Sequence, residues 1–400
     1  MRMSDHPRLV SIHTALKRVA ENRPSLGVEA IALDDCLGRT VANDVFAEVT
    51  VPPLDASAMD GYAVRYEDVR ERGARLNVLG EVAAGSPNAF SIDAGEAVRV
   101  FTGAPMPAGA DHILIQEHAD IGDDEVVVTH GQAMARHIRK AGGDFHQGDR
   151  ILHAGTRLSP RHIGVAASAN HGSLSVYRRP SVAILTAGSE LRPPGSSLSD
   201  GQIAESNSYT LSKLLESQGA KVSRLSTAPD DERSISSKFE EAANADIIVT
   251  VGGASVGKHD LVRTVFSQRG GEYVFERIAV RPGKPTWFGK LGDQTILGLP
   301  GNPTAAFVML SLLMKGLMFG SNSIEFTDAF LATQLPANGP RETFVRGRVD
   351  LEKGKARVHA LNDQDTSRVY SLTSTNCLIH RPGDAPQKST GELLQIVMLD

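Results

Sequence analysis

The chain has 400 residues, and its formal net charge of -5 comes from 47 Asp and Glu against 42 Lys and Arg. Hydrophobic residues make up 41% and charged residues 22%, which is ordinary for a globular protein and excludes a disordered or fibrous chain. The length predicts about two to four domains. The acidic balance gives no overall field that would attract nucleic acid or an anionic membrane.

Cysteine usage and the apolar runs indicate the compartment. The two cysteines, Cys36 and Cys377, lie far apart and neither belongs to a CxxC pair, so we expect a protein of a reducing compartment, the cytoplasm. The first residues lack the apolar core that is typical of a signal peptide. The longest apolar run, within 305–314, is too short to span a bilayer and predicts a buried helix.

Three stretches in the first half of the chain differ in their residue pattern. Residues 1–50 begin with a helical pattern whose apolar face is formed by Ile12, Leu16 and Val19. Residues 51–145 hold short β-like runs between glycines and prolines, which predicts a small β-domain. Residues 146–178 return to mixed structure with a helix expected after the Ser159-Pro160 turn.

The stretch 179–328 predicts a different architecture. Ser181–Thr186 and Asp246–Val251 are apolar runs typical of fully buried strands, and a helical pattern follows each of them. This alternation of strand, loop and helix predicts a doubly wound parallel sheet with helices on both faces. Residues 329–400 instead alternate short β-like pieces, for which we expect a small C-terminal β-barrel.

Three loops of this stretch follow predicted strands, where open parallel sheets bind their ligands: 186–190, 252–260 and 300–303. The middle loop reads G-x-x-x-x-G-K, but His259 stands where a phosphate loop needs Ser or Thr to hold magnesium. This difference excludes a nucleotide triphosphatase loop. Two interpretations remain open: backbone N–H groups that hold an oxyanion at a helix N-terminus, or a plain glycine turn.

The segment Arg281-Pro-Gly-Lys284-Pro285 places two cations directly before a predicted strand. Since proline lowers the entropy lost on ordering, the two charges can be aimed at an anion in advance. We therefore interpret this segment as functional, although an isolated segment of this kind is more often a solvated turn.

The predicted β-domain carries weaker candidates. A basic cluster that includes Arg139 and Lys140 could hold phosphate, but such a cluster is more often a solvated face. Asp60 follows a turn of small residues and is a weak candidate for a metal ligand or an acid–base group. The 13 histidines show no zinc-site spacing, and no G-x-S-x-G elbow indicates a serine hydrolase.

A series of short strings along the chain identifies a family. In chain order they are CLGRTVANDV, PPLDASAMDGYAV, TGAPMPAGAD, RKAGGD, TAGSEL, ESNSYTL, VGGASVGKHD, RPGKPTWFGKL and GLPGNPTAAF. One such string would be weak, whereas the whole series in this order is specific. The chain resembles, over nearly its full length, the molybdopterin molybdenumtransferases, the family that includes the C-terminal domain of gephyrin.

The resemblance implies an α/β multidomain fold. A parallel-sheet domain of the molybdopterin-binding type would take residues 179–328, and a C-terminal β-barrel residues 329–400. Residues 1–50 and 146–178 would form one small mixed α/β domain, into which residues 51–145 are inserted. The family also implies an elongated homodimer with its active cleft between subunits.

The resemblance further implies the last step of molybdenum cofactor biosynthesis. In that reaction molybdate is joined to adenylylated molybdopterin, the adenylate is hydrolysed with Mg²⁺, and AMP and the finished cofactor are released. Molybdopterin adenylyltransferase and cofactor-receiving molybdoenzymes are implied partners, with no role for nucleic acid or membrane.

The family motifs also imply site residues. Catalytic roles fall to Asp60, Asp144, Asp260 and Lys284, and Mg²⁺ ligation falls to Glu190 and Asp260. Substrate contacts are expected from Thr102, Glu190, Asp230, Gly252, Gly253, Ser255, Gly257, Arg281, Pro300, Pro303, Arg346 and Ser371. Asp60, Thr102 and Asp144 would come from the β-domain of one subunit. The parallel-sheet domain of the facing subunit would supply Glu190, Asp230, Asp260 and Lys284, and the C-terminal barrel would supply Arg346 and Ser371.

Five positions depart from the family pattern, one of them Ala204, which replaces a residue that is usually aromatic. Ser189 and Glu205 each stand where the family usually has Asp, and Lys258 replaces an acidic residue. Arg281 replaces a frequent Lys, which changes a compact ammonium into a planar fork. Because the predicted pocket loses a carboxylate and gains a cation, we expect weaker magnesium binding, and tungstate stays open as an alternative to molybdate.

Two other functions stay open at this point. The chain could hold molybdopterin or molybdate without turnover, or act as a scaffold in the manner of gephyrin. It could also be a molybdopterin adenylyltransferase, but that enzyme needs only the parallel-sheet domain. This chain carries a β-domain and a C-terminal segment as well.

Overall fold

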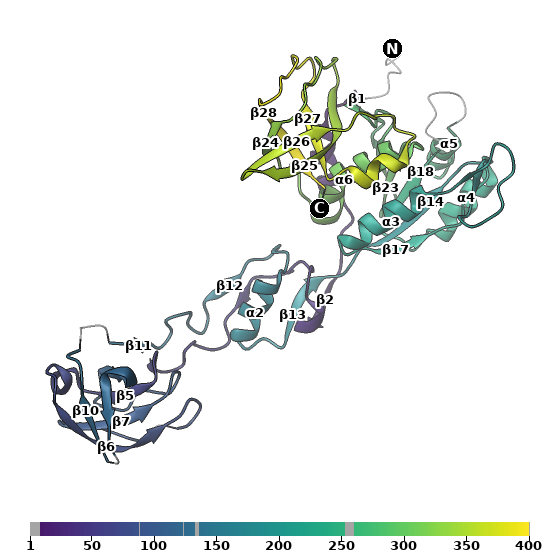
Figure 1. Cartoon of the computed structure of the whole chain (residues 1–400). Coiled ribbons are helices and arrows are strands. Elements are labelled where there is room, and N and C mark those ends of the chain that lie inside the picture. The colour runs from purple at the N-terminus through teal and green to yellow at the C-terminus, as the bar shows by residue number, and fades with distance from the viewer. Residues whose placement is uncertain (1–8, 88, 123, 133–135, 253–259, 400) are drawn as a thin grey trace, which may run out of the picture. The chain divides into compact units, whose positions relative to one another are not determined.

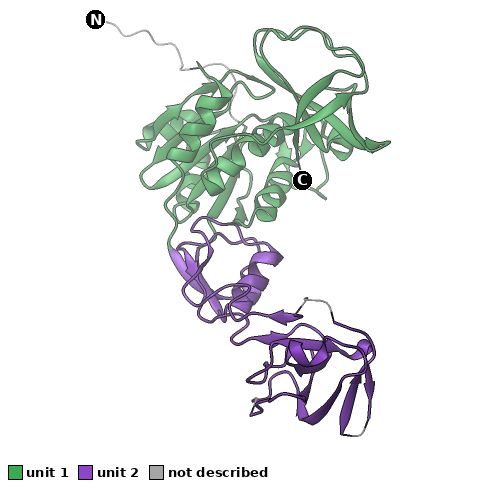
Figure 2. Ribbon diagram, turned by 90° about the vertical axis from the view of Figure 1, so that its left-hand side faces the viewer, with its two compact units in different colours: residues 1–27, 178–400 green, residues 28–177 purple. Residues whose placement is uncertain are grey.

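The computed structural model describes residues 9–399 except 88, 123, 133–135 and 253–259. It divides into two compact units, which Figure 2 colours separately: residues 28–177 form one, and residues 178–400 form the other with the segment before Val28. Within the described residues, no helix is long and apolar enough to cross a membrane.

The unit of residues 28–177 begins and ends in a small mixed part. Strand β2 (Val28–Ala32) pairs with β13 (Ser173–Tyr177), and β3 (Val45–Phe46) pairs with β12 (Arg150–Leu152). Helix α2 (Pro160–Ser168) starts with proline at its first turn, where the missing N–H costs no hydrogen bond. Because each pair joins the two ends of this sequence, the mixed part forms only when both ends are present.

The inserted β-domain is a six-stranded sheet in the order β8-β5-β7-β6-β10-β9. Figure 1 labels β5, β6, β7 and β10 of this sheet. Its strands are β5 (Gly61–Val64), β6 (Arg75–Val82), β7 (Glu96–Val100), β8 (His112–Ile115), β9 (Ala119–Ile121) and β10 (Glu125–Val128). The chain enters and leaves side by side, because Val51 bridges Phe145 and β4 (Ala56–Ser57) pairs with β11 (Ile138–Arg139). Only β6 and β7 pair in parallel within this sheet.

The larger unit is built on a six-stranded sheet in the order β17-β14-β18-β23-β22-β19. Its strands are β14 (Ser181–Thr186), β17 (Lys221–Arg224), β18 (Ile247–Val251), β19 (Glu272–Phe275), β22 (Trp287–Leu291) and β23 (Gln294–Leu299). The first four strands in the order are parallel, as the sequence predicts. Strand β22 is antiparallel to both β23 and β19, which the sequence pattern did not predict, because the residues of a strand do not reveal the direction of its neighbour.

Helices cover both faces of this sheet, as Figure 1 shows. Val182, Ile184 and other alternate strand residues pack with α3 (Asn207–Ser217) and α6 (Pro303–Phe319). Ala183 and Leu185, together with alternate residues of the neighbouring strands, pack on the opposite face with α4 (Glu232–Glu241) and α5 (Leu261–Gln268). Since consecutive strand residues point to opposite faces, a strand buried on both sides is apolar throughout.

The N-terminal helix packs in a different domain from the predicted one. Helix α1 (Ile12–Glu21) contacts α6, and β1 (Leu9–Val10) pairs with β20 (Arg277–Ile278). At Gly316 of α6, an added Cβ would lie 2.9 Å from the carbonyl oxygen of Ser321, which leaves no room for a side chain, and at ordinary contact distance, 3.4 Å, from Val19 Cγ1 of α1. The prediction that residues 1–50 form one domain with 146–178 therefore differs from the structure before Val28. The amphipathic pattern predicted the buried face but not its partner.

The apolar run within 305–314 lies in α6, which buries residues from Thr304 to Met318 around most of its circumference. The prediction of a buried helix is confirmed. Helix α6 ends at Gly320, whose φ of 75° is the left-handed conformation that terminates many helices.

The C-terminal residues form a closed five-stranded barrel. Its strands are β24 (Thr327–Leu331), β25 (Glu342–Glu352), β26 (Lys355–Ala360), β27 (Cys377–Arg381) and β28 (Leu393–Met398). Pairing of β25 with both β26 and β27 closes the ring. The short strand β21 (Val280–Arg281) adds in parallel to β25, so the segment before β22 is attached to the barrel. The predicted barrel is confirmed.

Asp246 fastens the start of the parallel sheet. Its carboxylate accepts two hydrogen bonds of 2.6 Å from Arg178 and bonds of 2.7 Å from the amide and hydroxyl of Ser181. Partial burial alone would raise the pKa of Asp246, but the hydrogen bonds from Arg178 and Ser181 lower it to about 2.

We expect Asp246→Asn to lower the free energy of unfolding by about 2 kcal/mol at pH 7. The folded pKa lies below the ordinary value of 3.8, so this stabilisation is present above about pH 4 and is lost as the pH falls toward 2. Urea unfolding of both proteins at pH 7 and pH 3 measures the effect. A difference between the two proteins that is as large at pH 3 as at pH 7 would contradict the assignment.

Candidate functional site

Loops at the carboxyl ends of the parallel strands pack against one another. Gly252, directly after β18, has a φ of 91°, and an added Cβ would lie 2.4 Å from the carbonyl oxygen of Ala187. An added Cβ on Gly301, after β23, would lie 3.5 Å from Gly252 Cα. The loops after β14, β18 and β23 therefore meet at one edge of the sheet, where the sequence predicted a ligand site.

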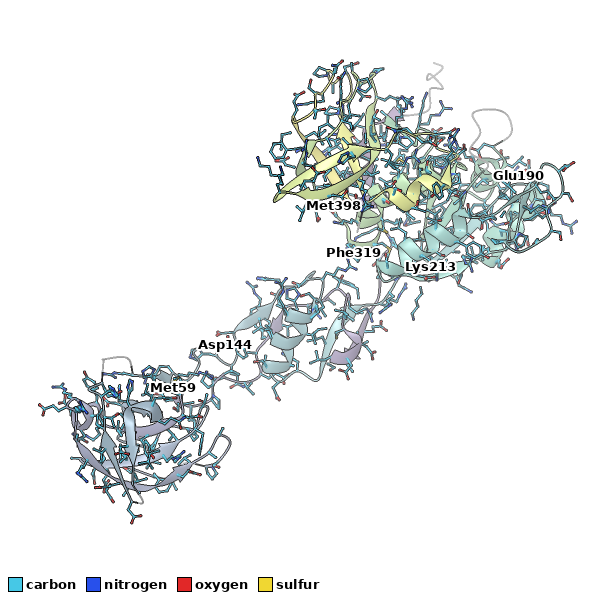
Figure 3. The ribbon with its side chains drawn as sticks, viewed as in Figure 1. Met59, Asp144, Glu190, Lys213, Phe319 and Met398 are labelled. Carbon is cyan, nitrogen blue, oxygen red and sulfur yellow. The ribbon has the colours of Figure 1, made fainter. Side chains whose placement is uncertain are left out.

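The first of these loops carries two predicted residues, Glu190 and the variant position Ser189. The Glu190 carboxylate is exposed and lies over Gly188, where an added Cβ would approach it to 2.8 Å. The Ser189 amide donates to Asp230 Oδ2 at 2.9 Å, and the Asp230 amide donates to Ser189 Oγ at 3.1 Å. This reciprocal pair joins Asp230 to Ser189, the residue before Glu190, which Figure 3 labels.

The departure at Glu205 has a structural explanation. Glu205 is buried, and its two oxygens accept hydrogen bonds from the amide and hydroxyl of Ser208 in the first turn of α3. A carboxylate that satisfies a free N–H at a helix N-terminus is stabilised there. In the same turn, Asn207 Nδ2 donates to the carbonyl oxygen of Gly301 at 2.9 Å and so ties α3 to the sheet edge.

The Pro300–Pro303 loop is held by the barrel as well. Pro300 is buried at the end of β23, and Pro303 opens α6. Asn302 Nδ2 donates to Thr366 Oγ1 at 2.8 Å, and the amide of Thr304 donates to the carbonyl oxygen of Thr366 at 3.1 Å. A segment of the C-terminal barrel therefore caps the N-terminus of α6, which the sequence did not indicate.

Asp260 has partners for both carboxylate oxygens. Oδ1 accepts from the amide of Arg263 at 3.1 Å, which caps α5, and Oδ2 lies 3.0 Å from Arg263 Nε. Only 14% of the Asp260 side chain is exposed. Burial raises the pKa of Asp260 to about 6, although Arg263 acts in the opposite direction. Such a buried, perturbed carboxyl group at a sheet edge is a candidate for function.

Of the two predicted cations, Arg281 ends β21 and Lys284 lies between β21 and β22. Arg281 and Lys284 are both exposed, and the backbone of Arg281 pairs with Thr343 of the barrel. Gly283 has a φ of 112°, and an added Cβ would lie 2.2 Å from the Met309 side chain of α6. Because β22 runs antiparallel to β23, this segment reaches the sheet at the edge where β23 ends.

Arg346 lies in the barrel strand β25 and is bonded to Ser371, the other residue predicted from the barrel. Its side chain is buried, and its guanidinium donates to the carbonyl oxygens of Asp363 and Asp365, each at 3.0 Å, and to Ser371 Oγ at 2.7 Å. These bonds order the barrel segment that carries Thr366, and the predicted substrate contact of Arg346 stays a prediction. Ser371 lines a shallow cavity of about 550 Å³ together with Asp363 and Arg368.

Asp60 and Thr102 meet in the β-domain. Asp60 Oδ1 accepts hydrogen bonds from the Thr102 amide at 2.7 Å and hydroxyl at 2.9 Å. The hydrogen bond from the Thr102 amide, followed by the one from its hydroxyl, lowers the pKa of Asp60. Asp60 and Thr102 are both exposed. The site therefore offers an ionised carboxylate to a ligand at neutral pH.

Asp144 lies where the chain leaves the β-domain, and its amide donates to the carbonyl oxygen of Val51 at 3.0 Å. Nearby in sequence, Lys140 Nζ lies 2.6 Å from Asp55 Oδ2, and the Ala141 amide donates to Asp55 Oδ1. Hydrogen bonds from Lys140 and Ala141 lower the pKa of Asp55. This pair joins two predicted motifs, and the basic cluster is thus partly neutralised. Figure 3 labels Asp144 and also Met59, which precedes Asp60.

Four residues of interest lie outside the described part of the chain: Gly253, Ser255, Gly257 and Lys258. Within the described residues, no three His, Cys, Asp or Glu side chains form a group that could hold a metal ion. The residues that sequence analysis missed are Arg263, Asn207 and Thr366. Only Arg263 had a local signal, because a basic residue three positions after a helix N-cap Asp can pair with it.

The chain matches three family descriptions in succession. Residues 10–170 match "MoeA N-terminal region (domain I and II)", residues 183–319 match "Probable molybdopterin binding domain", and residues 328–399 match "MoeA C-terminal region (domain IV)". The matches follow the order of the mixed and β parts, the parallel-sheet part and the barrel.

Curated relatives and solved structures match over nearly the whole chain. A molybdopterin molybdenumtransferase of Haemophilus influenzae is 32% identical, covering 97% of this chain and 98% of the relative. Molybdopterin molybdenumtransferase 2 of Mycobacterium tuberculosis is 31% identical, covering 96% and 98%. The crystal structure of a molybdopterin biosynthesis moeA protein from Pyrococcus horikoshii OT3 has a TM-score of 0.83 at 27% identity, covering 98% and 100%. The chain therefore belongs to the molybdopterin molybdenumtransferase family.

Proposed function

We propose that this protein is a molybdopterin molybdenumtransferase, which inserts molybdenum into adenylylated molybdopterin and hydrolyses the adenylate in molybdenum cofactor biosynthesis. The observation that carries the proposal is the match to curated molybdenumtransferases over 97% of the chain, which includes the β-domain and the barrel. An adenylyltransferase or an isolated binding domain would need only the parallel-sheet part. No observation favours the non-catalytic or scaffold alternative.

The loops at the sheet edge supply the groups that this chemistry needs. Lys284 and Arg281 are exposed cations that would hold the oxygens of molybdate, and the loops around Gly252 and Gly301 would receive the phosphates. Asp60 would accept a hydrogen bond from the pterin, because its carboxylate is kept ionised by Thr102. These roles are proposals that rest on charge, exposure and position.

Magnesium is part of the proposal, and the carboxylates present suit one of its usual modes. Mg²⁺ is commonly bound by one or two carboxylates together with substrate phosphates and water, so a group of three protein ligands is not required. Glu190 has an exposed carboxylate, and Asp260, which is paired with Arg263, would be the second ligand. The ion would neutralise phosphate charge when bound.

A reconstitution assay tests the function. The full chain is incubated with adenylylated molybdopterin, Mg²⁺ and molybdate, and AMP and pterin-bound metal are measured. We expect molybdate-dependent AMP release with molybdenum bound to the product. Tight pterin binding without AMP release would overturn the enzyme in favour of a binding protein. Competing tungstate in the same assay identifies the preferred oxyanion.

We also propose that the protein acts as a cytoplasmic homodimer, with the adenylyltransferase and the cofactor-receiving enzymes as partners. Two inactive variants, Asp60→Asn and Lys284→Ala, test whether residues of different chains act together. If they do, mixing the two variants after dissociation should restore part of the AMP release. Persistent inactivity in verified mixed dimers would count against a shared site.

Ser189→Asp tests the departure beside Glu190. An Asp side chain can still accept from the Asp230 amide, and it adds a carboxylate at the predicted Mg²⁺ site. We expect the Mg²⁺ concentration for half-maximal AMP release to fall about threefold to tenfold, which corresponds to roughly 1 kcal/mol of added attraction. Ser189→Asn keeps the hydrogen bond without the charge and serves as the control. Equal Mg²⁺ titrations for Asp and Asn would show that this position is incidental.

A further inference from the structure

Arg263 connects separate segments of the sheet-edge site through one side chain. It lies in the first turn of α5, and only 18% of its side chain is exposed. Nη2 donates to the carbonyl oxygen of Glu276 at 2.8 Å and to that of Pro285 at 2.9 Å. Pro285 ends the segment that carries Arg281 and Lys284, so Arg263 is bonded directly to the backbone of the cationic loop.

The same side chain faces the acidic side of the site. Its Nε lies 3.0 Å from Asp260 Oδ2, while its amide donates to Asp260 Oδ1. The N–H of this Nε is buried and makes no hydrogen bond among the described residues, so the Nε–Oδ2 contact is an ion pair without hydrogen-bond geometry. Arg263 therefore holds Oδ2 of Asp260 by charge and Oδ1 through its backbone amide.

Rigid neighbours restrict the movement of Arg263. The centre of its guanidinium lies 5.7 Å from the ring of Trp287 and 6.0 Å from the ring of Tyr273, and Trp287 is almost completely buried. The Tyr273 hydroxyl donates to the carbonyl oxygen of Arg263 at 3.3 Å. Aromatic walls and carbonyl acceptors suit a planar guanidinium, which donates in fixed directions, better than a flexible ammonium.

We propose that Arg263 is a positioning residue for the molybdenum-insertion reaction, because it holds the Asp260 carboxylate and the Lys284 segment in a fixed relation. This inference rests on the proposed function. Arg263 need not touch the substrate: it keeps an acidic and a cationic group in register so that both act on one bound molecule. Errors of about 1 Å in such register lower turnover by up to roughly a hundredfold.

Two substitutions of Arg263 separate its ion pair with Asp260 from its hydrogen bonds to Glu276 and Pro285. Arg263→Lys keeps a positive charge near Asp260 but loses the planar fork that donates to Glu276 and Pro285. Arg263→Met keeps an unbranched side chain against Trp287 and removes both the charge and the bonds. Arg269→Met is the matched control, since Arg269 caps the other end of α5 and bonds to Ser236 and Glu240 of α4.

Kinetics of the full-length protein give the first readout. We expect Arg263→Met to raise the molybdate KM at least about tenfold and to lower kcat as well, with Arg263→Lys between it and the wild type. Arg269→Met should keep both constants even where it lowers the thermal midpoint to a similar extent. Equal kinetic constants for Arg263→Met and wild type, or equal losses in Arg263→Met and Arg269→Met, would overturn the positioning role.

Hydrogen exchange gives a second readout that needs no turnover. In Arg263→Met and Arg263→Lys, the amides of Thr286 and Ile278, which donate to the carbonyl oxygens of Gly283 and Lys284, should exchange at least about tenfold faster, whereas Arg269→Met should leave them unchanged. Unchanged exchange there would refute the tether whatever the assay shows. If the wild type releases no AMP, the proposed function fails, while the exchange result still decides whether Arg263 holds the segment.

Discussion

Lys284→Ala should lower kcat/KM for molybdate-dependent AMP release by about a hundredfold to a thousandfold, which is the usual cost of removing one fixed electrostatic group from an anionic transition state. Lys284 is exposed, and its backbone carbonyl oxygen accepts from the Ile278 amide at 3.1 Å. Because that backbone bond does not depend on the side chain, the fold should survive the substitution. Steady-state kinetics with varied molybdate measure the loss.

Two further variants show whether the charge or its place is decisive. Lys284→Arg keeps a cation on the same backbone and should retain more activity than Lys284→Ala, although an ammonium and a guanidinium differ in shape. Lys290→Ala removes a lysine of β22 whose Nζ lies 3.3 Å from the Asp293 carbonyl and from Thr295 Oγ1. It should leave turnover unchanged. A Lys284→Ala protein with wild-type kcat/KM would exclude Lys284 from the anion site.

Asp260→Asn should abolish AMP release, or lower it by at least about a hundredfold, without loss of stability at pH 7. The activity falls because an amide carries no charge to hold a cation, whose stabilisation of the reacting phosphate is worth several kcal/mol. The helix cap survives, since Asn and Asp cap helices about equally well. Activity assays at saturating Mg²⁺ and thermal unfolding of the metal-free protein measure the two effects.

The stability of this variant follows from the position of the carboxyl group. Burial raises the pKa of Asp260 to about 6, so the folded metal-free protein binds this proton more tightly than the unfolded chain does. The free energy of unfolding therefore decreases as the pH rises from about 4 to about 6, and this loss persists above pH 6. Because Asn carries no charge, the variant does not suffer this loss, although Arg263 loses its counter-ion.

Asp231→Asn provides the matched control, because Asp231 caps α4 by accepting from the Ser234 amide at 2.8 Å and is exposed. We expect it to keep turnover and stability close to those of the wild type. Near-normal AMP release by Asp260→Asn would remove Asp260 from the active site. A large fall in its thermal midpoint would instead identify Asp260 as a residue retained for folding.

The strong local patterns of the larger unit were predictable from the sequence. Strands β14 and β18 are continuous apolar runs, and α5 starts directly after Asp260, which caps it. These features depend on residues within one strand or one helical turn, so periodicity and capping rules detect them. The loops after β14, β18 and β23 could be assigned to one edge because parallel strands end at the same side of a sheet.

Other features could not be predicted because their partners are distant in sequence. The apolar face of α1 was clear, but it contacts α6, some 300 residues away, in place of the expected mixed domain. The antiparallel pairing of β22 with β23 and β19 was also missed, since apolar strands look alike in either orientation. A residue pattern indicates which face of a helix or strand is buried, whereas the shape and volume of the packed side chains decide which element covers that face.

The candidate site divides in the same way. By itself the sequence determined which chemical groups are present: the glycine turns, the Arg281 and Lys284 cations, and the acidic residues Asp60, Glu190 and Asp260. Only the tertiary structure decided which of them meet. It pairs Asp60 with Thr102 and Ser189 with Asp230, directs Arg346 into the barrel, and joins Asp260 to the Lys284 segment through Arg263. The identity of each side chain is fixed by the sequence. Hydrogen bonds between distant segments, however, form only after packing has brought their backbones within about 3 Å.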